Sequence, residues 1–120
     1  MIEGFYVITF RGHSDWGTGM LVLFNGIVAG ADVGGVTYDG FYTSDDEAVD
    51  IALTLTIPPG THLVQGITPQ SHQYSFKLET KIDLKTWLLQ QPILIQTAYG
   101  PVNVIFKKIR NFPHDTAYGK

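Results

Sequence analysis

The chain holds few residues whose types and spacing suggest a reaction. His13, Ser14 and Asp15 are the three residue types of a hydrolase triad, and they are consecutive. Consecutive residues cannot adopt triad geometry, because the base must reach a nucleophile held elsewhere in the fold. The histidines fall at no metal-ligand spacing on a strand or helix; they are His13, His62, His72 and His114. The sequence therefore predicts no catalytic residue, no metal site, no cofactor and no enzyme activity.

An acidic segment is the next chemical feature. Ser44, Asp45, Asp46 and Glu47 place three consecutive carboxylates between two expected strands. Such a loop would attract a basic surface on a protein partner, although salt screens this attraction beyond about 8 Å, so it would orient more than bind. The alternative is a polar turn whose side chains bond to the turn backbone. Calcium binding is less favoured, because the segment lacks the length and alternation of a calcium loop.

Aromatic side chains on the expected strands could line a ligand cavity, or could simply form the core. The residues predicted for such a cavity are Phe5, Phe41, Tyr74, Phe76 and Phe106. Glycines within the same strands favour the cavity slightly, because they leave volume. These glycines also indicate strong curvature and close backbone approach.

The composition narrows the classes of protein. A chain of 120 residues suits one domain, expected over residues 1–110, with a loose tail over 111–120. The absence of cysteine excludes disulfides and fits a reducing compartment. The net charge is −3, so the chain lacks the basic surface that is typical of nucleic-acid-binding proteins. The first residues lack signal-peptide features and no long apolar run is present, so a cytoplasmic location away from membranes is expected.

Alternation of apolar and polar residues dominates the chain. Apolar side chains occupy every second position over 48–57 and 72–82, which predicts strands with one buried face. Segments 5–10, 20–24 and 102–109 are apolar on both faces, so their outer side is expected to contact a ligand, a second subunit or other protein. In all, eight strands are predicted, over about 4–11, 16–24, 27–33, 36–43, 48–57, 72–82, 93–99 and 102–109.

Turn signals connect these strands. Asn25-Gly26 predicts a two-residue hairpin of type I′, because both residues tolerate positive φ. Gly100-Pro101 predicts another turn. Residues 84–89 predict a short helical turn with Asp83 as the N-cap. Short strands at regular spacing with strand glycines predict an all-β fold, an eight-stranded antiparallel up-and-down barrel.

A succession of motifs resembles a known family. The chain has Gly4-Phe5-Tyr6, then Gly17-x-Gly19 with Leu23 and Gly26, then Gly30-Ala31-Asp32, then Tyr38-x-Gly40-x-Tyr42. This ordered set resembles the GrlR family, small proteins typified by a negative regulator of type III secretion. The family usually has Gly-Gly-Asp where this chain has Gly30-Ala31-Asp32. The resemblance covers roughly residues 4–110.

The resemblance implies a calycin-like, lipocalin-like barrel that forms a homodimer and holds a protein partner, a transcriptional activator in the typifying case. It also implies that Ser44, Asp45, Asp46 and Glu47 occupy the place of an acidic partner-binding loop. The leading hypothesis is therefore a dimeric regulator that sequesters a protein partner. The alternative is a calycin-type carrier with a small apolar ligand inside the barrel.

Overall fold

A computed structural model describes residues 2–113 as an all-β fold with one short helix. The eight strands are β1 (Gly4–Arg11), β2 (Trp16–Phe24), β3 (Ile27–Asp32), β4 (Thr37–Ser44), β5 (Ala48–Ile57), β6 (Tyr74–Asp83), β7 (Ile93–Thr97) and β8 (Gly100–Arg110), and the helix is α1 (Leu84–Leu88). No helix within the described residues is long and apolar enough to cross a membrane.

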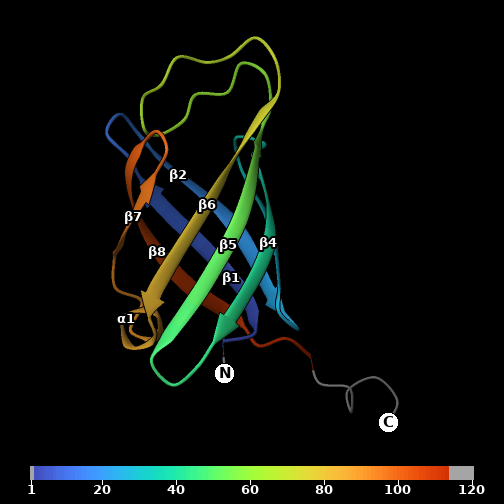
Figure 1. The fold of residues 1–120 in the computed structure, drawn as a ribbon, viewed down its shortest axis with the longest axis vertical. Helices are drawn as coiled ribbons and strands as arrows, with labels where there is room; N and C mark the ends of the chain where they lie inside the picture. The colour runs from blue at the N-terminus through green and yellow to red at the C-terminus, as the bar shows by residue number, and fades with distance from the viewer. Residues whose placement is uncertain (1, 114–120) are drawn as a thin grey trace.

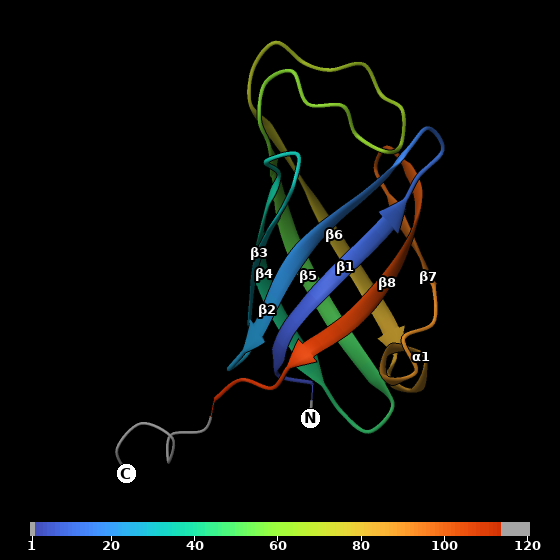
Figure 2. The same ribbon diagram turned by 180° about the vertical axis from the view of Figure 1, so that it is seen from behind.

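All eight strands belong to one antiparallel sheet, in the order β6-β5-β4-β3-β2-β1-β8-β7. Chain neighbours are sheet neighbours except where β1 pairs with β8. The sheet curls until its two edge strands, β6 and β7, lie on the same side of the molecule (Figure 1). Seen from behind, β2, β1 and β8 cross the opposite wall (Figure 2). The predicted fold class, a nearly closed eight-stranded antiparallel barrel, is confirmed.

The interior of the barrel follows the predicted alternation. On β1, Tyr6 and Ile8 are buried; on β5, Val49, Ile51 and Ile57 are buried. Leu53 and Leu55 share the inward face of β5, whereas alternate residues such as Val7 on β1 and Ala52 on β5 face outward. Because side chains alternate between the faces of a strand, one face of each strand fills the barrel and the other forms its outer wall.

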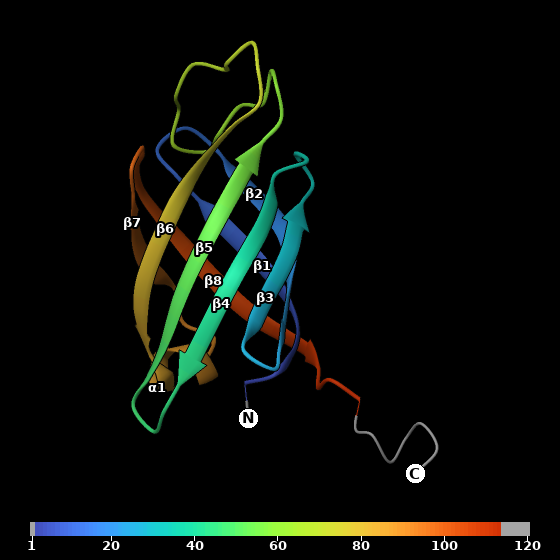
Figure 3. The same ribbon diagram turned by 45° about the vertical axis from the view of Figure 1, so that its right-hand side comes forward.

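Two strand glycines allow this curvature. A Cβ atom on Gly30 would collide with the carbonyl oxygen of Met20, and one on Gly40 with the carbonyl oxygen of Ala52. Neither clash involves a flexible side-chain end, so these positions exclude any larger residue. The prediction that strand glycines mark close backbone approach is confirmed at both sites. They lie on the neighbouring strands β3 and β4 (Figure 3).

One predicted turn is confirmed and another is displaced. Asn25 and Gly26 have φ values of 54° and 81°, as a type I′ hairpin requires. The turn expected at Gly100-Pro101 is wrong by two residues: Thr97 pairs with Gly100, and 98–99 form the turn. The Thr97 hydroxyl determines this register, because it donates to the Gly100 carbonyl at 2.6 Å and accepts from the Tyr99 N–H at 3.2 Å.

Helix α1 closes one end of the barrel. Its predicted N-cap is confirmed, since the Asp83 carboxylate accepts the Thr86 N–H at 3.1 Å. Trp87 points from the helix into the core, where only 2% of its surface is exposed. Its ring stacks on Phe106 at 4.3 Å between centroids, and its indole N–H donates to the Tyr6 hydroxyl at 3.2 Å. Trp87 therefore acts as the plug of this end.

The barrel is not joined by a ladder between β6 and β7 within the described residues. Aromatic contacts bridge this seam near the opposite end. Tyr99 meets Phe76 edge-to-face at 5.0 Å and Tyr74 at 6.3 Å between ring centroids. Side-chain packing, rather than backbone hydrogen bonding, thus holds the two edge strands together.

The segment after β8 begins against the barrel. Phe112 stacks on Phe24 at 4.0 Å and on Phe5 at 5.4 Å between centroids. The rest of the tail predicted to be loose, residues 114–120, lies outside the described residues, as does His114.

Trp87→Ala is expected to lower the free energy of unfolding by about 3–5 kcal/mol, because it removes the plug and leaves a cavity against Phe106. Leu88→Ala is the matched control in the same helix, and its side chain is largely exposed. That control is expected to change stability by less than about 0.5 kcal/mol. Denaturant unfolding followed by circular dichroism measures both; equal losses would contradict the assignment of Trp87 as the plug.

Candidate functional site: a cavity at the open end of the barrel

A cavity of about 210 Å³ occupies the barrel at the end away from α1. Its floor is apolar and comes from strands on all sides, with Ile51, Leu78, Val104 and Phe106 among its residues. Its mouth is formed by the β1–β2 turn, the β3–β4 turn and the long β5–β6 loop. Trp87 fills the opposite end, so the barrel is plugged at one end and hollow at the other.

The loop of residues 58–73 extends over the mouth (Figure 1). Two contacts attach it to the rim. The Ser14 N–H donates to the Val64 carbonyl at 2.9 Å, and the Gln65 side-chain amide donates to the Thr97 hydroxyl at 3.1 Å. Leu63 and Val64 are half-buried and pack against the core. The loop therefore forms part of the cavity wall.

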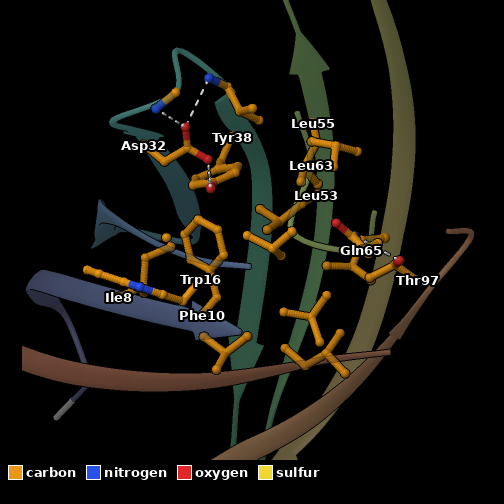
Figure 4. A pocket seen from close by; sticks show the side chains of 18 of the residues that line it. Ile8, Phe10, Trp16, Asp32, Tyr38, Leu53, Leu55, Leu63, Gln65 and Thr97 are labelled. Atoms are coloured by element: carbon orange, nitrogen blue, oxygen red, sulfur yellow. Dashed lines mark hydrogen bonds between the residues drawn. The ribbon is translucent and has the colours of Figure 1, made fainter. Parts of the chain in front are cut away.

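Asp32 anchors the rim on the other side. One of its carboxylate oxygens accepts the N–H groups of Gly34 and Val36 at 2.9 and 3.1 Å. Its second oxygen accepts the Tyr38 hydroxyl at 2.6 Å (Figure 4). The first two bonds form a turn stabilised by an Asp side chain. The third connects the turn to strand β4, so the carboxylate is held in one position.

Burial raises the pKa of the Tyr38 hydroxyl well above its ordinary value, and the hydrogen bond to Asp32 raises it further. The negative carboxylate disfavours a second negative charge on the phenol. Tyr38 therefore stays a neutral hydrogen-bond donor to Asp32 throughout the physiological pH range.

The two walls of the cavity differ in character. Figure 4 shows Asp32, Tyr38, Trp16 and Phe10 on one side. On the opposite side it shows three leucines, Leu53, Leu55 and Leu63. The hydrogen-bonded pair of Gln65 and Thr97 lies on the same side. The cavity thus has an aromatic wall with a carboxylate and an aliphatic wall facing it.

The structure separates the five residues predicted for the cavity. Phe106 lies in its lining. Tyr74 and Phe76 face inward but pack against Tyr99 at the seam. Phe41 is a correction: it is 69% exposed on the outer wall, because strand alternation directs its neighbours Gly40 and Tyr42 inward.

Phe5 is a second correction. It alternates with buried Tyr6 and so lies on the outer side, where Phe112 stacks on its ring. The prediction missed the residues that give the rim its chemistry, namely Asp32, Tyr38 and Trp16. One signal was present: an Asp two residues before Gly34-Gly35 is typical of a turn bonded by its side chain.

The acidic segment lies at the plugged end of the barrel, where β4 joins β5, and so is remote from the cavity mouth (Figure 3). One Asp45 carboxylate oxygen accepts the N–H groups of Glu47 and Ala48 at 2.8 and 2.9 Å. These bonds lower the pKa of Asp45. Asp45 therefore bonds the turn backbone, as the polar-turn alternative expects, and all four residues of the segment are exposed.

The other reactive residue types are dispersed. His13, Ser14 and Asp15 are all exposed in the β1–β2 turn. His62 lines the cavity, and His72 is exposed just before β6. Within residues 2–113, no three His, Cys, Asp or Glu side chains gather as a metal site.

No protein-family model matches this chain, and no curated protein matches it significantly. The class is therefore defined by the fold and the cavity alone: a nearly closed antiparallel β-barrel with a hollow, partly covered end. The likeness to the GrlR family rests on the motifs quoted above.

Asp45→Asn is expected to destabilise the fold at neutral pH and to have little further effect in acid. Because the folded-state pKa of Asp45 is lowered, its contribution is present above the ordinary value of 3.8 and is lost as the pH falls through the lower folded value. Thermal unfolding measured from neutral pH to strong acid, with Asp46→Asn as the control, tests this. Parallel pH profiles for the two variants would contradict the turn role of Asp45.

Proposed function

We propose that this protein binds a small apolar molecule inside its barrel. The observation that carries the proposal is the cavity of about 210 Å³ with an apolar floor. An engineered cavity of about 150 Å³ lined by aliphatic and aromatic side chains binds benzene. The present volume therefore suits a ligand of one or two rings.

The arrangement of polar groups supports binding rather than packing alone. Ligand pockets are mostly apolar, with a few placed polar groups that fix orientation. Here those groups stand at the mouth: the Asp32–Tyr38 pair on one side and the Gln65–Thr97 pair on the other. A ligand would place its apolar body on the floor and any polar group near the rim.

Thr80→Phe is expected to abolish binding of the uncharged probe 1-naphthylmethanol, because Thr80 lines the cavity and the new ring would fill it. Thr54→Phe is the matched control, since Thr54 on β5 does not line the cavity. Titration calorimetry measures affinity and stoichiometry. We expect one probe per chain for the natural sequence and the control, and at least a tenfold loss for Thr80→Phe, equivalent to about 1.4 kcal/mol.

Absence of probe binding to the natural sequence would contradict the proposal. Equal binding by both variants would place the probe elsewhere on the surface. Native mass spectrometry of the protein from its own host offers an independent readout, in which a retained small mass would identify the natural ligand.

A second observation favours the dimeric regulator. The outer wall formed by β1 to β4 is largely apolar, with Asp39 on β4 and Arg11 at the end of β1 as the charged side chains at its outward strand positions. The strand register sets Val7 opposite Met20, Met20 opposite Ala31, and Ile27 opposite Phe41. Exposed side chains at these positions include Met20 at 46% and Phe41 at 69%. Contiguous exposed apolar surface marks an interaction site.

The neighbouring wall has the opposite character. On β6 the outward positions are Ser75, Lys77, Glu79 and Lys81. Because the outward side chains of β1 to β4 are mostly apolar whereas those of β6 are mostly charged, we propose that a second copy of the chain covers the apolar wall. Two such faces related by a two-fold axis bury the same hydrocarbon on each protomer. Two of the three doubly apolar segments expected to form a dimer face, 5–10 and 20–24, belong to β1 and β2 of this wall, and the third, 102–109, belongs to β8 beside β1.

In this second proposal the dimer holds a protein partner. All three carboxylates of the acidic segment are exposed, and Asp45 is held in place by its bonds to the turn backbone. They would orient a basic partner surface at the plugged end of the barrel. This contact leaves the cavity mouth accessible, so ligand and partner could bind together.

Met20→Lys is expected to convert a dimer into a monomer, because it places a charge in the centre of the apolar wall. Ser75→Lys adds the same charge to the polar wall and is the control. Light scattering after size-exclusion chromatography measures the mass in solution. A natural sequence that elutes with the mass of one chain at all concentrations would overturn the dimer.

A further inference from the structure

The charges of the cavity lining are unbalanced. Two carboxylates reach it, those of Asp15 and Asp32, while no lysine or arginine belongs to its lining. His62 is the one lining side chain that can carry a positive charge. An apolar anion such as a fatty acid would therefore enter without a fixed cation to meet it, at a desolvation cost.

Asp32 retains capacity for a ligand. An ionised carboxylate offers about four acceptor positions. The Gly34 N–H, the Val36 N–H and the Tyr38 hydroxyl fill three of them. These same bonds fix the carboxylate at the rim, so the remaining position is oriented before any ligand arrives. Pre-organised groups bind with less loss of side-chain freedom.

Aromatic rings stand on the same wall as this carboxylate. Phe10, Trp16 and Tyr38 all line the cavity with Asp32, and Figure 4 shows the four on one side. Trp16 is 58% exposed at the mouth, so its ring is accessible. Aromatic faces attract ammonium groups within about 6 Å, most strongly for Trp, and several rings together form the cages that bind methylated ammonium ions.

We propose that the ligand of this barrel is a small apolar amine, bound with its ammonium group against Asp32 and the neighbouring aromatic rings and its hydrocarbon on the cavity floor. This inference rests on the ligand-binding function proposed above and names its chemical class. The opposite wall, with Leu53, Leu55 and Leu63, would enclose the hydrocarbon.

Three probes with one naphthyl body and different head groups test the charge preference: 1-naphthylmethylamine, 1-naphthylmethanol and 1-naphthoate. At mildly alkaline pH the amine remains a cation and the acid an anion. The structure predicts that the amine binds about tenfold more tightly than the alcohol, as one charged hydrogen bond would give. The acid is expected to bind more weakly than the alcohol.

Asp32→Asn is expected to lower the affinity for the amine severalfold more than the affinity for the alcohol, and so to remove the preference for the amine. The amide keeps an oxygen to accept the Gly34 and Val36 N–H groups, and the Tyr38 hydroxyl can rotate to accept from the new NH₂. Asp39→Asn is the matched control, because Asp39 is exposed on the outer face of β4. It removes the same charge from the chain without touching the cavity.

Trp16→Leu provides an independent variant should Asp32→Asn fail to fold, since an exposed ring at the mouth contributes little to stability. It is expected to lower the amine-to-alcohol affinity ratio severalfold by removing the cation–π contact. His62→Gln removes the one lining side chain that can carry a positive charge. This variant is expected to leave the amine-to-alcohol affinity ratio unchanged.

The outcomes separate this inference from the function on which it rests. No binding of any probe would overturn both. Binding of the alcohol with an equal or weaker affinity for the amine would overturn the amine alone. An equal loss of preference in Asp32→Asn and Asp39→Asn would also overturn it, because the preference would then follow total charge. Loss confined to Asp32→Asn and Trp16→Leu supports it.

Discussion

The close approach of neighbouring backbones, β3 to β2 and β4 to β5, is the constraint on which the rest of this structure depends. Gly30 and Gly40 let neighbouring backbones come together where a Cβ atom would collide with carbonyl oxygens. A sheet that can coil this tightly brings its two edge strands to the same side. The curvature encloses one interior, and the alternating apolar residues supply its filling. Without these glycines, the same strand pattern would suit a flatter sheet.

The two ends of the barrel interior are filled differently. At one end, α1 inserts Trp87, whose stacking on Phe106 and hydrogen bond to Tyr6 fill the space. At the other end the cavity remains, with the β5–β6 loop forming part of its wall. Dense packing at the plugged end stabilises the barrel. The other end can therefore stay hollow.

The surfaces proposed for recognition are likewise separate from one another. The mouth carries the carboxylate of Asp32 and the ring of Trp16, whereas the acidic segment lies at the plugged end. The apolar outer wall around Met20 is a third surface. Since the proposed ligand, second copy and partner would each occupy a different surface, none excludes another. Coupling between them would have to pass through the barrel wall itself, for instance through β4, which bears both Tyr38 and Phe41.

The sequence by itself determined the strands, the Asn25-Gly26 hairpin and the Asp83 cap, because these depend on local alternation, backbone freedom and short-range hydrogen bonds. It also determined that the fold is an all-β barrel. Only the tertiary structure decided which aromatic residues face inward: Phe41 lies outside although its strand was predicted, since its exposure depends on the direction in which the sheet curls. The tertiary structure also decided which residues form the rim of the cavity. Asp32, Trp16 and Gln65 belong to three separate segments, and they line one cavity only when the strands close around a common axis.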